Sequence, residues 1–167
     1  KEYLIEAAEK SLKRLGVETL DILQLHSPDL EKLERDEPWE ALIRLKEQGK
    51  IQHAGLSIQS FKESEQAHLM DKHYDLLDCI QVRYNLLERK AEKELFPKAI
   101  EHGIGVIVRI PMLFGLLSGK FTRESIFEGD DHRRFNLDQE KLESYLSKME
   151  NMSDLYERYP DWSPAQI

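Results

Sequence analysis

The sequence is poor in cysteine, in basic residues and in long apolar runs, and each shortage excludes a class of protein. The single cysteine, Cys79, excludes an internal disulfide. With 24 basic against 32 acidic residues the formal net charge is -8, which disfavours a polyanionic partner such as DNA or RNA. No stretch has the length of a membrane span or the form of a signal peptide. We therefore expect no nucleic acid partner, no membrane association and a cytoplasmic location.

The length and the apolar content are those of a globular protein. A chain of 167 residues, 40% of them hydrophobic, can fill one sizeable core. The sequence begins at Lys1 without a methionine, and it ends where Ser163 and Pro164 predict the first turn of a helix. From these two ends we expect a fragment of a longer protein.

Helix-type and strand-type segments alternate along the first 110 residues. Apolar residues at helical spacing predict helices over residues 4–15, 38–48, 61–71 and 88–102. Short apolar stretches rich in β-formers predict strands over residues 19–25, 53–58, 78–82 and 105–110. This alternation predicts an α/β fold with a parallel sheet, its strands joined by right-handed crossovers. A doubly wound sheet and part of an eight-fold barrel both fit, and in both a ligand lies at the C-terminal ends of the strands.

The last third of the sequence is less regular. The charged stretch 123–136 has no clear period and predicts a mobile surface loop. Helical spacing resumes over residues 137–156 and predicts one or two helices. We expect their apolar stripe to face the core rather than a partner.

Polar side chains stand at the predicted C-terminal tips of all four strands. The chain has His26 at the first tip, Ser57 at the second, Gln81 at the third and Arg109 at the fourth. A lone histidine or serine at a strand end is more often an ordinary structural residue than part of a site. Four polar tips in succession nevertheless predict a ligand site.

Other motifs that carry chemistry are absent or misplaced. The histidines lack the spacing of a helical zinc motif, so we expect no metal. The glycines of GIGVIV, from Gly103, precede their strand, whereas those of a dinucleotide-binding turn would follow it. No serine lies in a Gly-x-Ser-x-Gly elbow, and no tyrosine has a lysine four residues later.

The segment PMLFGLLSGKF, residues 111–121, follows the last predicted strand. Its two glycines and the cation of Lys120 suit a loop whose backbone N–H groups surround a phosphate. The alternative is a glycine-containing turn before a helix. Spacing alone leaves both interpretations open.

Four segments in this order resemble the second half of an aldo-keto reductase: SLKRLGVETLDILQLHSPD, GKIQHAGLSIQS, IQVRYNLLER and GIGVIVRIPMLFGLLSGKF. The resemblance covers residues 1 to 122 and the final SPAQI. It implies a partial TIM (β/α)8 barrel containing about strands four to seven, with residues 1–167 as a single partial domain. For the full-length protein it implies reduction of aldehydes or ketones by hydride transfer from a nicotinamide cofactor, NADPH with NADH as the alternative.

The resemblance also implies a role for each matched residue. His26 matches the family's catalytic histidine, which hydrogen-bonds the substrate carbonyl. Ser57 and Gln81 match the residues that hold the nicotinamide carboxamide, although Ile58 replaces the asparagine that many relatives have next to the serine. Arg109 stands where many relatives stack a tyrosine on the nicotinamide. The cofactor-binding loop is matched by Pro111, Met112, Gly115, Leu117, Gly119 and Lys120.

The family's catalytic aspartate, tyrosine and lysine would lie upstream of Lys1. The tyrosine is the general acid, so we expect this chain to be inactive by itself. Four strands cut from a barrel have two open edges, and we expect self-association or pairing with the missing half of the barrel. The alternatives are a non-catalytic cofactor-binding regulatory module and a half-barrel that only oligomerises.

Overall fold

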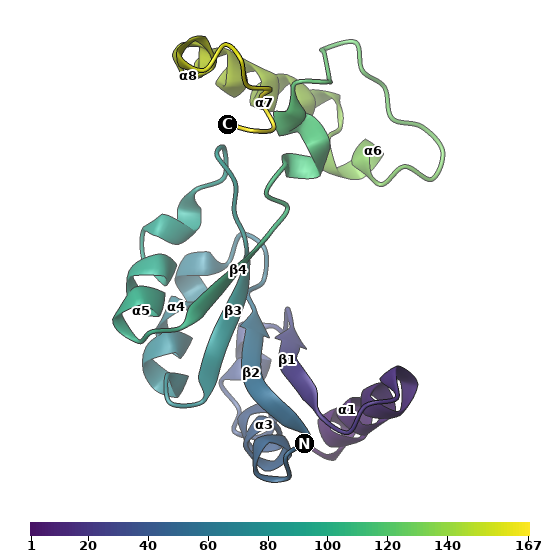
Figure 1. Cartoon of the computed structure of the whole chain (residues 1–167), viewed down its shortest axis with the longest axis vertical. Helices are drawn as coiled ribbons and strands as arrows, with labels where there is room; N and C mark the ends of the chain where they lie inside the picture. Colours follow the sequence, from purple (N-terminus) through teal and green to yellow (C-terminus); the bar gives the residue numbers. More distant parts are fainter. The chain divides into compact units, whose positions relative to one another are not determined.

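The computed structural model describes residues 1–167, which divide into two compact units (Figure 1). The first unit comprises Lys1–Arg83 and Lys90–Arg109, and the second comprises Tyr84–Arg89 and Ile110–Ile167. None of the helices combines the length and the apolar character that crossing a bilayer requires.

The first unit alternates helices with parallel strands (Figure 1). Its elements in chain order are α1 (Glu2–Leu15), β1 (Leu20–His26), α2 (Leu30–Leu33), α3 (Glu37–Glu47), β2 (Ile51–Ser57), α4 (Glu63–His73), β3 (Leu77–Arg83), the 3-10 turn η1 (Lys90–Glu92), α5 (Leu95–Glu101) and β4 (Gly105–Arg109). The strands pair in the order β1-β2-β3-β4, all parallel. A doubly wound sheet reverses its strand order at a switch point, so this sequential order agrees with the wall of a barrel.

One face of the sheet carries the core of the first unit. Leu25 of β1 pairs with Leu56 of β2, and Leu56 pairs with Ile80 of β3. All three side chains are buried, and α3 and α4 pack against β2 and β3. On the edge strand β4 the same face carries Val106, the register partner of Ile80, and Val108, which are 41% and 39% exposed. The cover over the sheet is therefore thinnest at β4.

The N-terminal helix shows how the sequence sets these boundaries. α1 buries Ile5, Ala8 and Leu12, which stand three or four residues apart and so share one side of the helix. Gly16 then takes the left-handed conformation with φ 69°, and its N–H donates to the carbonyl of Leu12. Glycine adopts this conformation without a steric penalty, so the helix ends where the sequence predicts.

The single helix predicted over residues 88–102 is wrong. The structure has η1 over Lys90–Glu92 and α5 only over Leu95–Glu101. Proline has no backbone N–H, and its ring collides with the carbonyl four residues earlier, so it is tolerated only in the first turn of a helix. Because Pro97 is the third residue of α5, the helix cannot extend back to residue 88. The other three predicted helices and all four predicted strands lie within two residues of the observed bounds.

The second unit is helical. It contains η2 (Leu113–Ser118), α6 (Arg133–Asn136), α7 (Gln139–Glu150) and α8 (Ser153–Arg158), so residues 137–156 form two helices. Its buried core consists of Leu113, Leu116, Leu117, Leu137 and Leu142. Residues 119–132 contain neither helix nor strand. Within this segment the rings of Phe121 and Phe127 meet edge to face, and the guanidinium of Arg133 lies over both.

Candidate active site

Three of the predicted site residues lie in one row across neighbouring strands. His26 is the register partner of Ser57, and Ser57 is the register partner of Gln81. Partners in a parallel sheet point to the same face, and neighbouring strands lie about 4.8 Å apart. The imidazole, the hydroxyl and the amide therefore share the face opposite to the buried Leu25 and Leu56.

The turn after β1 fixes the surroundings of this row. His26, the last residue of β1, is exposed. The next residue, Ser27, has φ 46°, an uncommon conformation for a residue other than glycine. Its hydroxyl lies 3.2 Å from the hydroxyl of Ser57, which is only 2% exposed. Ser27 thus connects the tip of β1 to the tip of β2.

A buried glutamine holds the same two turns from the helix side. Gln66 of α4 is fully buried. Its Nε2 donates to the carbonyl of Pro28 at 3.0 Å, and its Oε1 accepts from the backbone N–H of Gln59 at 2.9 Å. One side chain therefore satisfies a backbone group in the turn after β1 and another in the turn after β2.

Arg109 ends β4 on the same face as the row. It follows Ile107, the register partner of Gln81, by two residues. One terminal nitrogen of its guanidinium donates to the hydroxyl of Ser60, whereas its buried Nε makes no hydrogen bond. An unpaired buried donor carries a cost of about 1–3 kcal/mol, so this position suits a ligand with a polar acceptor.

The remaining predicted site residues belong to the second unit. Pro111 and Lys120 are exposed, Met112 is half-buried, and Leu117 belongs to the hydrophobic core. The N–H groups of Gly115 and Leu117 both donate to the carbonyl of Met112, at 2.9 and 3.3 Å. The N–H of Gly119 donates to the carbonyl of Leu116 at 3.1 Å. The amides expected to face a phosphate therefore bond within the loop in this structure.

The same loop has a strained backbone. Ile110, Leu113 and Phe114 have φ values of 59°, 46° and 57°, in the left-handed region that these side chains disfavour. Gly115 follows with φ 92°. Strained residues persist only where the surrounding structure holds them, and they cluster in binding and switch segments.

Ser27 and Gln66 are not among the predicted site residues. Ser27 stands between His26 and a proline, a turn position that marks it as a neighbour of the site. No signal in the sequence identifies Gln66, because a glutamine in an amphipathic helix ordinarily faces water. Its role depends on two turns that only the folded chain brings to one place.

Residues 1–167 match the sequence profile described as the Aldo/keto reductase family. The chain belongs to this family. It is 32% identical over 154 residues to the aldo-keto reductase YhdN of Bacillus subtilis, with 91% of this chain and 45% of that protein covered. It is 35% identical over 132 residues to a putative voltage-gated potassium channel subunit beta of Schizosaccharomyces pombe, covering 77% and 38%. It is 30% identical over 161 residues to the NADH-specific methylglyoxal reductase of Escherichia coli, covering 95% and 48%.

Among solved structures, the chain resembles the glycerol dehydrogenase AKR11B4 from Gluconobacter oxydans. The TM-score is 0.74 at 36% identity, with 95% of this chain and 47% of that chain covered. The four parallel strands with their helices therefore match part of an aldo-keto reductase barrel, which removes the doubly wound alternative. The family is one of carbonyl-reducing oxidoreductases that use NAD(P)H. The chain spans less than half the length of these relatives.

Proposed function

We propose that this chain forms strands four to seven of an NAD(P)H-dependent reductase that transfers a hydride to an aldehyde or a ketone. The observation that carries the proposal is the row of His26, Ser57 and Gln81 on one face of the sheet. Family membership supplies the reaction class. The sheet supplies the arrangement, because these side chains end neighbouring strands and point the same way.

In this proposal the reduced nicotinamide supplies the hydride when it is bound, and the side chains of this chain position the reactants. The exposed imidazole of His26 donates to the substrate carbonyl oxygen and orients it. A hydroxyl and an amide can each donate and accept, so Ser57 and Gln81 can pair with both ends of a carboxamide. The contact from Ser27 restrains the hydroxyl of Ser57. These contacts would fix which face of the nicotinamide ring meets the substrate.

Arg109 has a separate proposed role beside the nicotinamide. Arg109 is the last residue of β4, on the same sheet face as His26, Ser57 and Gln81, and the Nε of its guanidinium makes no hydrogen bond. A fixed positive charge there disfavours binding of the cationic oxidised ring relative to the neutral reduced ring. The difference in binding free energy is about 1 kcal/mol when the two charges are partly exposed to solvent. We expect Arg109→Ala to weaken binding of the reduced cofactor more than binding of the oxidised cofactor. Fluorescence and calorimetric titration would measure the two affinities. Equal weakening of both forms would contradict this role.

We assign the pyrophosphate to the loop that holds Pro111, Met112, Gly115, Leu117, Gly119 and Lys120. Its exposed lysine offers a cation, and its glycines allow close approach of the backbone. Since three of its amides bond to loop carbonyls, anion binding would require these bonds to be shared or exchanged. The strained φ values at Leu113 and Phe114 are compatible with such a second arrangement.

We also propose that the proton donor of the reaction comes from a complementary half-barrel. β1 and β4 each have one strand neighbour, so each presents an open hydrogen-bonding edge. Beside β1 a groove of about 480 Å³ runs between α1 and α3, with apolar walls that include Leu4, Leu23 and Leu42. A further strand and helix of a barrel would cover this edge and this groove.

The test compares the chain alone with the chain co-expressed with the first half of a related reductase barrel. We expect no reduction of a panel of aldehydes by the chain alone, and NADPH-dependent turnover by the complex. His26→Ala should lower kcat, whereas Ser57→Ala should weaken cofactor binding. Turnover by the chain alone, or unchanged cofactor affinity on replacing both Ser57 and Gln81, would refute the proposal.

A non-catalytic regulatory module is the second candidate. The 35% identity to the putative potassium channel subunit beta is the observation in its favour. This reading predicts that the complex of the two halves binds NADPH but leaves every aldehyde unreduced. A chain that only oligomerises would bind no cofactor in the same titration.

A further inference from the structure

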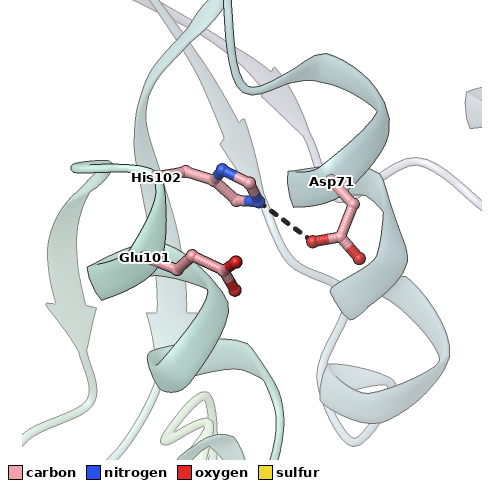
Figure 2. Close-up of side chains that lie close together, drawn as sticks. All are labelled: Asp71, Glu101 and His102. Carbon is pink, nitrogen blue, oxygen red and sulfur yellow. Dashed lines mark hydrogen bonds and ion pairs between the residues drawn. The ribbon is translucent and has the colours of Figure 1, made fainter.

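Three possible metal ligands meet at the ends of two helices, away from the row of strand tips. Asp71 lies near the end of α4, while Glu101 and His102 lie at the end of α5 (Figure 2). One ligand atom from each of the three lies within 4.8 Å of the other two. Asp71 and Glu101 are exposed, so water and ions can reach the cluster.

Two of these ligands are already held in position. Nε2 of His102 lies 3.0 Å from Oδ1 of Asp71 (Figure 2), and the His102 side chain is 18% exposed. The ring of Tyr74 stacks on His102 with centroids 5.0 Å apart and an interplanar angle of 15°. On the far oxygen of Asp71, Oδ2, the ammonium of Lys98 forms an ion pair. The Tyr74 ring and the Lys98 ammonium are therefore outer contacts that orient these two ligands, as is common around metal sites in proteins.

The local charge also favours a cation. α4 ends at His73 and α5 ends at Glu101, so the partially negative C-terminal ends of two helices border the cluster. The charge of Lys98 opposes a second cation, but its ammonium contacts Oδ2. An ion bound by Oδ1 and by Nε2 of His102 would replace the hydrogen bond that now joins these two atoms.

We propose that Asp71, Glu101 and His102 bind a divalent transition-metal ion, with zinc as the representative ion. One imidazole nitrogen and two carboxylate oxygens are a ligand set that zinc accepts, with water completing the coordination. Zinc bonds of about 2.0–2.2 Å place the ligand atoms of a tetrahedron about 3.4 Å apart. Nε2 of His102 and Oδ1 of Asp71 are already 3.0 Å apart, so the carboxylate of Glu101 is the group that has to move closer. Rotation of the exposed Glu101 side chain can provide this closure. The bound ion would link the end of α4 to the end of α5.

The sequence predicts no metal because spacing within one helix cannot detect this cluster. Asp71 and His102 stand on different helices, with β3 between them in the chain. The helices become neighbours only when the crossovers fold onto the sheet.

The test is calorimetric titration of the tag-free chain with zinc chloride, together with thermal unfolding in zinc and in EDTA. We expect one zinc ion per chain and a higher unfolding temperature in zinc. Glu101→Gln and His102→Gln should each weaken binding roughly tenfold or more and remove the thermal shift. Because Glu101 is exposed, its variant should fold even if replacing His102 does not.

The chain offers a matched control on the same helix. Nε2 of His68 lies 2.6 Å from Glu34, and Lys72 pairs with the other oxygen of that carboxylate. This trio repeats the imidazole, carboxylate and ammonium of the proposed site without a second carboxylate within ligand distance. His68→Gln should therefore leave zinc affinity unchanged. Absence of binding up to about 1 mM zinc, or equal affinity in the Glu101 variant and the parent, would overturn the proposal.

Discussion

The imidazole of His73 is the clearest case in which the burial of one residue makes the stability of the fold depend on pH. It stacks on Trp39 with ring centroids 3.7 Å apart, and its Nε2 is buried without a hydrogen bond. Burial, the largest of its influences, lowers the pKa of His73. The folded chain therefore favours the neutral ring, whereas the unfolded chain accepts a proton at the ordinary value of 6.5.

We predict that the free energy of unfolding falls as the pH falls below 6.5, the unfolded value for His73. Above that pH both states are neutral and this contribution is complete. Below it the unfolded state binds the proton first, and the loss is at most about 1.4 kcal/mol per pH unit until the folded pKa is reached. Urea unfolding followed by circular dichroism should show a smaller loss for His73→Phe. If the free energy of unfolding of this variant fell equally with pH, groups other than His73 would cause the pH dependence.

Gly55 is a position where the lack of a side chain allows neighbouring strands to pack closely. A Cβ added there would lie 2.7 Å from the sulfur of Cys79 and 2.9 Å from a carbon of Gln24. The Cys79 sulfur is buried, and burial raises the pKa of its thiol, which stays protonated at neutral pH. The close approach of β2 and β3 at this point thus requires glycine.

We predict that Gly55→Ala lowers the free energy of unfolding by about 1–3 kcal/mol, the usual effect of overpacking. Cys79→Ala removes the closest of the clashing atoms, so the double variant should lose less than the sum of the two single changes. Denaturant unfolding of all four proteins measures this coupling. Strict additivity would show that the contact is relieved elsewhere.

At the same scale, the sequence alone predicts the row of His26, Ser57 and Gln81 but not the residues that brace it. The row follows from strand ends and the period of two, both of which are local properties of the chain. Ser27 and Gln66 depend on contacts between turns that are distant in sequence. Such side chains can be identified only from the folded structure.

Among the elements, the turn between β3 and η1 depends on one asparagine. Asn85 is 4% exposed, and its Oδ1 accepts from the backbone N–H groups of Leu87 and Glu88, both at 3.0 Å. Its Nδ2 donates to the carboxylate of Glu88 and to the carbonyl of Ile110. The sequence shows a polar residue after a strand, which predicts a turn but not these four bonds.

We expect Asn85→Ala to destabilise the second unit by about 2–3 kcal/mol, since four hydrogen bonds of roughly 0.5–1.5 kcal/mol are lost and some partners stay buried. Asn85→Asp keeps the acceptor and is the matched comparison, although its charge repels Glu88. Hydrogen exchange of the Leu87 and Glu88 amides should report the change directly. Unaltered protection in the alanine variant would exclude the side chain as the cap of this turn.

The success of sequence reasoning also differs between elements. Strands and three helices are predicted within two residues because apolar periodicity and end glycines such as Gly16 and Gly49 act locally. The helix over 88–102 is mispredicted because the apolar pattern continues through Pro97 while the backbone cannot. In the loop from 119 to 132, two phenylalanine rings lie under the guanidinium of Arg133. The spacing of apolar residues in the sequence does not predict this contact.

For the whole molecule, the open edges of β1 and β4 dominate the expected behaviour. Each presents unpaired backbone groups, and the edge strand β4 carries Val106 and Val108, which are 41% and 39% exposed. We predict that the chain alone forms dimers or larger species by sedimentation velocity, and that Val108→Lys reduces this association by placing a charge on the edge strand. A stable monomer over the whole concentration range would contradict the prediction.

The order β1-β2-β3-β4 has a further consequence for biosynthesis. The strands β2, β3 and β4 each pair with the strand translated just before them, so none of these three pairings has to wait for a distant segment to leave the ribosome. Pairings between sequence neighbours close short loops and form faster than distant ones. The sheet can therefore grow in the direction of synthesis, one crossover at a time, while the rest of the polypeptide is still being made.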